Sequence, residues 1–132
     1  MTLWFADTAF YIALLSESDR FHDRAVELNA VPHRSVTTQF VLTELADGLS
    51  GTAARASCVR LLDALLRSKA VLVVPAAASL FDRGWELYRN RPDKEWSLTD
   101  CISFLVMEER NLREALTADH HFEQAGFVAL MK

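Results

Sequence analysis

Cysteine is scarce in this sequence, which has only Cys58 and Cys101 among its 132 residues. Two cysteines are too few for a disulfide framework, and these two lack the spacing of a zinc site. Both lie in apolar runs, so we expect them to be buried as small hydrophobic residues. A chain without disulfides suits a reducing compartment, and we expect the protein to be cytoplasmic.

Glycine and long apolar runs are also few. The four glycines are scattered, so there is no glycine-rich loop of the kind that cradles phosphate groups. The apolar N-terminal stretch, residues 3–15, is interrupted by Asp7 and has no basic segment before it. It is also too short to span a bilayer. We therefore expect a buried strand that leads into a helix, with no signal peptide and no membrane association.

Positive charge is not in excess, because the formal net charge is -4. Proteins that bind nucleic acid non-specifically usually carry a clear positive excess. A nucleic-acid site built from several acids does not need this positive excess in the protein itself. The acids repel one another unless cations neutralise them. Bound metal ions would then supply the positive charge that a phosphate group needs. The net charge therefore neither establishes nor excludes RNA as a substrate.

The composition is that of an ordinary globular protein, with 51% hydrophobic and 24% charged residues. Its length fits a single domain over residues 1–132. Short apolar runs alternate with longer amphipathic ones, and this alternation predicts the elements. We expect strands at 3–6, 35–37, 71–74, 115–117 and 127–130, and helices at 8–16, 20–29, 38–48, 53–68, 76–90, 97–110 and 120–124.

Strands that alternate with helices imply βαβ units, so the predicted fold class is α/β. The central sheet should be mainly parallel and covered by helices on both faces. The predicted strands are nearly continuous apolar runs, which is typical of strands buried on both faces. In open sheets of this kind, functional residues gather at the carboxyl ends of the strands.

Four acids are placed to meet near that edge of the sheet. Asp7 directly follows the first strand, and Asp119 follows the strand at 115–117. Glu44 lies about one turn into the helix after the second strand, and Asp100 lies in the first turn of the helix before the fourth. Oxygen-only acidic clusters suit Mg²⁺ or Mn²⁺. Two such ions can activate water and stabilise the attacking and leaving oxygens of a phosphodiester.

Each acid also has a structural alternative. Asp7 and Asp119 can cap the helices that follow them, since aspartate is a favoured N-cap residue. Asp100 stands three residues after Ser97, which is the spacing of a capping box. Both roles are compatible if Ser97 caps the helix while Asp100 points into the crevice. Glu44 is flanked by apolar residues, where a carboxylate without a partner raises the free energy of the folded state, so a cation could be its partner. The structural alternative is an ordinary glutamate at the edge of the surface, which is common.

Other polar groups carry weaker signals. His120 and His121 can ligate a metal ion, but neighbouring residues on a helix point in different directions, so we favour a structural or substrate-side role. Basic residues gather in two places and can flank an RNA groove, although solvated helix faces are the default interpretation. These are Arg55, Arg60, Arg67 and Lys69, and Arg83, Arg89, Arg91 and Lys94.

With these residues identified, the sequence resembles the PIN-domain ribonucleases, and among them the VapC-type toxins of bacterial type II toxin–antitoxin systems. The resemblance covers essentially the whole chain. Four segments carry it: FADTAF at residues 5–10, TEL at 43–45, WSLTDC at 96–101 and LTADHHF at 116–122. Each segment alone is a weak signal, but all four in this order on alternating strands and helices are specific.

The resemblance implies a three-layer α/β/α sandwich and a nuclease that needs Mg²⁺ or Mn²⁺ to cut single-stranded or looped RNA. It identifies the four acids as the catalytic set, with Asp7, Asp100 and Asp119 as metal ligands. Three hydroxyl residues match positions that support the acids or the metal-bound water: Thr8, Ser97 and Thr99. The resemblance also implies a toxin homodimer. It further implies an antitoxin protein that lays a segment across the active-site groove. Ala9 departs from the pattern, since many relatives have a second hydroxyl there.

Our mechanistic hypothesis is that Asp7 and Asp100 hold a first metal ion. Asp119 and Glu44 would complete its shell directly, through water, or through a second ion. The acids would act as ligands and proton acceptors and not as nucleophiles.

Three other classes of protein remain as alternatives. A phosphotransfer receiver domain also binds Mg²⁺ at strand ends, but it needs adjacent acids after the first strand and another acid after the middle strand. Here Asp7 stands alone and no acid follows Val74. A haloacid-type phosphatase needs a second aspartate where Ala9 stands. A non-catalytic PIN-like module that binds RNA or protein would lose the acids, and this sequence has all four.

Overall fold

The computed structural model describes residues 2–132, and its five strands form one sheet in the order β3-β2-β1-β4-β5. Every neighbouring pair is parallel. The strands are β1 (Thr2–Ala6), β2 (His33–Thr38), β3 (Val71–Val74), β4 (Glu114–Leu116) and β5 (Val128–Ala129). The helices are α1 (Thr8–Leu15), α2 (His22–Asn29), α3 (Gln39–Gly48), α4 (Thr52–Arg67), α5 (Ala78–Asn90), α6 (Leu98–Glu109) and α7 (His120–Gln124).

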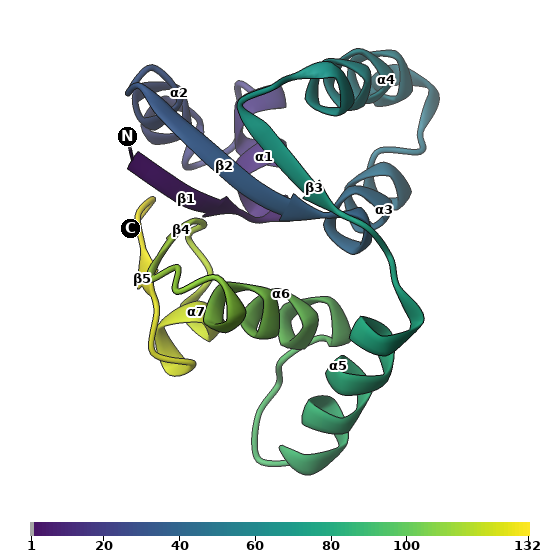
Figure 1. The fold of residues 1–132 in the computed structure, drawn as a ribbon. Helices are drawn as coiled ribbons and strands as arrows, with labels where there is room; N and C mark the ends of the chain where they lie inside the picture. Colours follow the sequence, from purple (N-terminus) through teal and green to yellow (C-terminus); the bar gives the residue numbers. More distant parts are fainter. Residues whose placement is uncertain (1) are drawn as a thin grey trace.

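Helices lie on both faces of the sheet, as Figure 1 shows. Helices α1 to α4 lie on one face and α5 to α7 lie on the other. Parallel neighbours cannot be joined by tight turns, so the chain crosses over one face or the other between successive strands. The predicted α/β class and the three-layer, mainly parallel architecture are confirmed. Within residues 2–132, no helix combines the length and the apolar character needed to cross a membrane.

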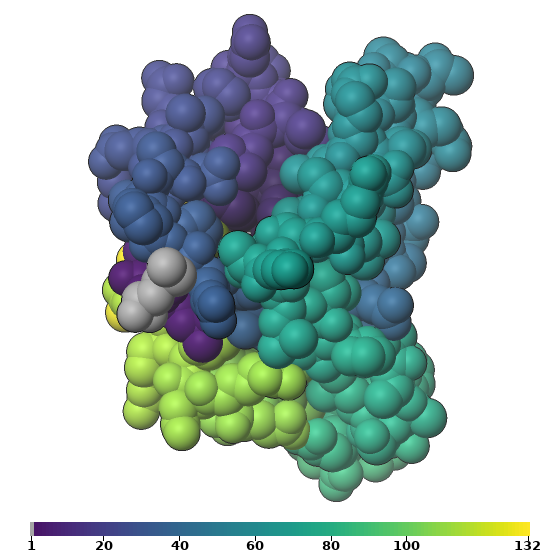
Figure 2. Space-filling view, turned by 45° about the horizontal axis from the view of Figure 1, so that its top comes forward, coloured from purple at the N-terminus to yellow at the C-terminus, as the bar shows by residue number. Residues whose placement is uncertain are grey.

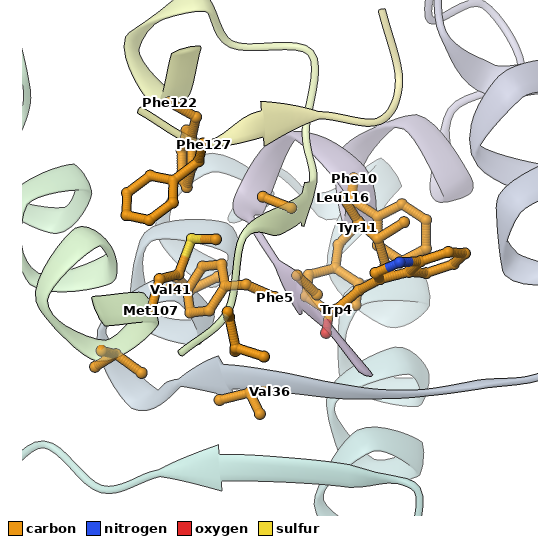
Figure 3. Close-up of a cluster of buried hydrophobic side chains, with 14 of the residues drawn as sticks. Trp4, Phe5, Phe10, Tyr11, Val36, Val41, Met107, Leu116, Phe122 and Phe127 are labelled. Atoms are coloured by element: carbon orange, nitrogen blue, oxygen red, sulfur yellow. The ribbon is translucent and has the colours of Figure 1, made fainter. Parts of the chain in front are cut away.

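The hydrophobic core lies on both sides of β1 because successive residues of a strand point to opposite faces. Trp4, Phe10 and Tyr11 pack on one side of β1, and Phe5 and Met107 pack on the other (Figure 3). All five side chains are buried. The carboxyl end of β1 is therefore held rigidly between the two layers, and this end carries the first of the candidate acids.

The two cysteines are free and buried, as the sequence predicts. Cys58 lies on α4 and Cys101 lies on α6. Burial raises the pKa of the Cys101 thiol to about 11. This thiol therefore stays protonated near neutral pH, which makes it a poor nucleophile.

Two helices begin two residues later than the sequence predicts. The helix expected over 20–29 begins at His22. The side chain of Asp19 accepts a hydrogen bond of 2.8 Å from the Phe21 N–H, and this contact holds the preceding residues in a turn. Helix α5 likewise begins at Ala78, two residues after the predicted start.

The edge strand β3 is more exposed than the sequence predicts. Leu72 is 47% exposed, and Leu3, which lies on the same face in β1, is 43% exposed. Strand β3 has a neighbour on one side only, and the helix that packs against it is α4. The expectation that all strands are buried on both faces is therefore wrong at this edge.

The contact between α5 and α6 depends on Gly84, which is buried on α5. A Cβ atom at this position would lie 2.3 Å from Cγ1 of Ile102 on α6. We expect Gly84→Ala to lower the free energy of unfolding by about 1–3 kcal/mol, because the two helices must move apart. Urea denaturation followed by circular dichroism measures this change.

Gly48→Ala is the matched control, since a Cβ there meets no atom within 4 Å. Alanine is the better helix former, so this variant should be unchanged or more stable by up to about 1 kcal/mol. Equal stability of both variants would contradict the close packing of α5 on α6.

Candidate metal centre

The topology of the sheet creates a crevice beside β1. Strand β2 lies on one side of β1 and β4 lies on the other, so the strand order changes direction between β1 and β4. Ligands of open α/β sheets bind at such a switch point, beyond the carboxyl ends of the strands. Asp7 follows β1 directly, and Asp119 lies three residues after the end of β4.

One cavity of about 490 Å³ at this position contains all four predicted acids. It is lined by Asp7, Thr8, Ala9, Ile12, Glu44, Gly48, Glu95, Ser97, Asp100, Asp119 and His121. Residues that are more than 100 positions apart in the sequence therefore meet in one place. The predicted convergence of the acids is borne out by the geometry.

Asp7 is almost completely buried, with 4% of its surface exposed. It occupies the N-cap position of α1, but its side chain makes no capping hydrogen bond, so the capping alternative is wrong. Its Oδ2 instead accepts a hydrogen bond of 2.9 Å from the Thr117 hydroxyl. Burial, and next the negative charge of Asp100, raise the pKa of Asp7 to about 7. This carboxyl group has a strong need for a compensating positive charge.

Asp100 both caps α6 and lines the cavity, which are the two roles that the sequence leaves open. Its N–H donates to the Ser97 hydroxyl at 3.0 Å and its Oδ2 accepts from the Ser97 N–H at 3.3 Å, which completes a capping box. The carboxylate also lines the cavity. Burial, and next the charge of Asp119, raise the pKa of Asp100. The capping box therefore aims this side chain at the other acids.

Hydroxyl groups also fix the other two acids. The Thr8 hydroxyl donates to Glu44 at 2.6 Å, so Glu44 does have the polar partner that its apolar surroundings require. The Thr117 hydroxyl accepts from the Asp119 N–H at 3.1 Å. Asp119 also caps α7, since its Oδ1 accepts from the N–H two residues later at 2.9 Å.

The predicted supporting residues differ in what they contact. Thr8 and Ser97 hydrogen-bond to acids of the cavity. Thr99 forms no hydrogen bond to any acid within residues 2–132 and does not line the cavity. Its predicted support of a metal-bound water stays a prediction.

Three residues of the centre were not predicted to be there. Thr117 is fully buried and holds both Asp7 and the backbone of Asp119. Glu95 enters the cavity from the loop before α6. His121, expected in a structural or substrate-side role, lines the cavity together with the acids. Thr117 had a local signal, namely a polar residue at the end of an apolar strand, and His121 had one in the His120–His121 pair, whereas Glu95 had none.

The donor set fits a divalent cation. Carboxylate oxygens are the ligands that Mg²⁺ and Mn²⁺ prefer. Two of the carboxylates here are buried next to each other, which disfavours their charged forms without a cation. A small doubly charged ion is the species that satisfies this site most simply.

The chain is similar to known proteins over nearly its whole length. The family model of the PIN domain matches residues 5–128. The chain belongs to the PIN-domain family. This PIN-domain chain is 32% identical over 125 residues to the 23S rRNA-specific endonuclease VapC20 of Mycobacterium tuberculosis, and the match covers 94% of this chain and 95% of that protein.

Solved structures show the same PIN fold. The crystal structure of Mycobacterium tuberculosis VapC20, described as a sarcin–ricin loop cleaving toxin, matches with a TM-score of 0.86 at 30% identity, over 96% of this chain and 97% of that one. VapBC2 from Rickettsia felis, bound to a promoter DNA fragment, gives a TM-score of 0.67 at 15% identity, over 97% of both chains. FitAcB from Neisseria gonorrhoeae gives a TM-score of 0.63 at 16% identity, over 97% of this chain and 95% of that one. The last two similarities show the fold alone.

The raised pKa of Asp7 predicts how the stability of the metal-free PIN domain depends on pH. An aspartate titrates near 3.8 in an unfolded chain and near 7 here. Between these values the unfolded state releases a proton that the folded state keeps, so stability falls as pH rises from about 4 to about 7. Asp7→Asn removes this penalty and should stabilise the metal-free protein at pH 8 by about 1–4 kcal/mol.

Urea denaturation in EDTA at several pH values between 4 and 8 measures the difference between the variant and the wild type. Asp82→Asn, at an exposed position on α5, is the control and should keep the pH dependence of the wild type. A constant difference between Asp7→Asn and the wild type over this range would show that Asp7 titrates normally.

Proposed function

We propose that this PIN-domain chain is a metal-dependent endoribonuclease and the toxin of a toxin–antitoxin pair. The observation that carries the proposal is the cavity in which Asp7, Glu44, Asp100 and Asp119 meet at the switch point of the sheet. The similarity to an endonuclease over nearly the whole length of both chains supports the same activity.

The roles of the side chains follow from their surroundings. Asp7 and Asp100 are the most buried of the acids and would hold the cation, with Asp119 beside them. When bound there, Mg²⁺ or Mn²⁺ would lower the pKa of a water molecule and offset the charge of the phosphodiester. Thr117 keeps Asp7 oriented. Thr8 keeps Glu44 at the edge of the cavity, where it can accept a proton.

The proposed substrate is a loop of RNA, as the name of VapC20 indicates for that relative. A second hollow of about 390 Å³ shares Glu95 with the acidic cavity, and Arg89, Arg91, Lys94 and Trp96 line it. The Arg91 guanidinium lies 4.9 Å from the Trp96 ring centroid. Trp96 itself is buried, whereas the Arg91 side chain is partly exposed. Unpaired bases stack on arginine planes, so this hollow suits RNA that approaches the cavity.

The decisive experiment compares purified wild type and Asp100→Asn on a 23S rRNA fragment that carries the sarcin–ricin loop, on transfer RNA and on messenger RNA. Mg²⁺ or Mn²⁺ should support cleavage by the wild type, and EDTA should stop it. Asp100→Asn should lower the rate by at least about 100-fold, because it removes a cation ligand while its amide oxygen can still accept from Ser97.

Asp82→Asn is again the control and should cleave like the wild type. Full activity of Asp100→Asn, or equal activity in EDTA, would refute the proposed function. Cleavage of every RNA at the same rate would refute only the preference for one loop. Phosphotransfer to the protein without RNA cleavage would favour a receiver domain.

We further propose two protein partners, each on a separate apolar face. Helix α4 projects as a ridge at one side of the molecule (Figure 2), and its Val59 and Leu66 are more than half exposed beside a groove of about 270 Å³. We assign this groove to the antitoxin segment that is expected to cross the acidic cavity, because α3 contributes residues to both. Helix α5 carries Phe81, Trp85 and Tyr88, each 44% exposed, and we assign this face to a toxin homodimer. Exposed apolar patches of this kind usually mark interaction sites.

Two variants separate these partners when the chain is co-expressed with a candidate antitoxin, which we expect a small reading frame next to its gene to encode. The double variant Val59→Glu with Leu66→Glu should lose the co-purified antitoxin and remain a dimer. Trp85→Glu should become a monomer and keep the antitoxin. Light scattering of each preparation measures the masses, and unchanged masses in both variants would show that these faces bind neither partner.

A further inference from the structure

The side chain of His121 points at the acids of the metal centre. Its Nδ1 lies 3.3 Å from Oδ2 of Asp100 and 3.3 Å from Oδ1 of Asp119. This nitrogen is buried and makes no hydrogen bond within the described part of the chain. Both carboxylate oxygens lie within ion-pair distance of Nδ1, yet neither completes a hydrogen bond with it, and a buried polar atom without a hydrogen bond is unusual.

The local fold fixes this position. The His121 N–H donates to Oδ1 of Asp119, so the cap of α7 brings the imidazole ring over the carboxylate. The neighbouring His120 is more exposed, with 61% of its side chain exposed against 18% for His121, and its Nδ1 lies 3.7 Å from the same Oδ1 of Asp119. Of the two histidines, His121 is the one that lines the cavity.

The distances match those between ligands of one ion. In an octahedral shell with metal–ligand bonds of about 2.1 Å, adjacent donor atoms are about 3.0 Å apart. The separations of 3.3 Å from Nδ1 to two carboxylate oxygens come close to this value. Donor atoms of Asp119, His120 and His121 also lie within 4.8 Å of one another.

We propose that Nδ1 of His121 is a direct ligand of the divalent cation, so that the centre combines imidazole nitrogen with carboxylate oxygen. This inference rests on the proposed metal-dependent function and makes its metal site more specific. An imidazole ligand favours Mn²⁺ over Mg²⁺, because Mg²⁺ prefers oxygen donors alone. The protein should therefore bind Mn²⁺ more tightly than an all-carboxylate site would.

The test is electron spin echo spectroscopy of the whole protein loaded with Mn²⁺, which detects ¹⁴N nuclei bound to the ion. The wild type should show nitrogen coupling, and His120→Ala should retain it. His121→Ala should lose the coupling and weaken Mn²⁺ binding by at least about 10-fold in calorimetry, since even indirect support of a ligand contributes this much. Mg²⁺ binding should change less.

His121→Asn is the second variant, because its side-chain oxygen reaches about the position of Nδ1. It should bind Mn²⁺ without the imidazole coupling. Bound Mn²⁺ without nitrogen coupling in the wild type would overturn this inference and leave the proposed nuclease intact. Coupling that persists in His121→Ala and disappears in His120→Ala would assign the ligand to His120. This result would also overturn the inference about His121. Failure of the wild type to bind Mn²⁺ would overturn both this inference and the proposed function.

Discussion

Repulsion between carboxylates that are buried together is the constraint on which the rest of this structure depends. Asp7 and Asp100 each raise the free energy of the folded state when charged, and the effect is largest where solvent is excluded. A fold can keep such a cluster only if strong packing elsewhere offsets the cost. Here the core on both sides of β1 supplies that packing.

Specific contacts hold the acids in place against this repulsion. Each of the four has a hydrogen bond to a hydroxyl or backbone group: Thr117 for Asp7, Thr8 for Glu44, Ser97 for Asp100, and the α7 backbone for Asp119. The bond between Thr117 and Asp7 joins the ends of β4 and β1, and the bond between Thr8 and Glu44 joins α1 to α3. Binding a cation would release the accumulated repulsion and couple the stability of the protein to its metal site.

Much of this arrangement can be predicted from the sequence because it follows from local rules. Apolar runs locate the strands, and an acid directly after a parallel strand must lie at the carboxyl edge. Asp7 and Asp119 satisfy that rule, and the spacing of Ser97 and Asp100 predicts the capping box that the structure contains. The four PIN motif segments lie at the expected places on these elements.

Other features depend on contacts that span the sequence, and no local pattern reveals them. The bond between Thr117 and Asp7 joins residues 110 positions apart. The entry of Glu95 depends on the path of an irregular loop, and the exposure of Leu72 depends on which strand forms the edge of the sheet. The sequence does not show that His121 faces the cavity, because the hydrogen bond from its N–H to Asp119 sets the direction of its ring.

In the proposed metal centre, carboxylates from distant segments share one ion. Anomalous diffraction from crystals of the protein grown with Mn²⁺ tests this most directly, because it locates the ion without assumptions about ligands. The account predicts a peak within about 2.0–2.3 Å of carboxylate oxygens from both Asp7 and Asp100. An ion bound elsewhere on the surface, with these two side chains free of metal, would contradict it.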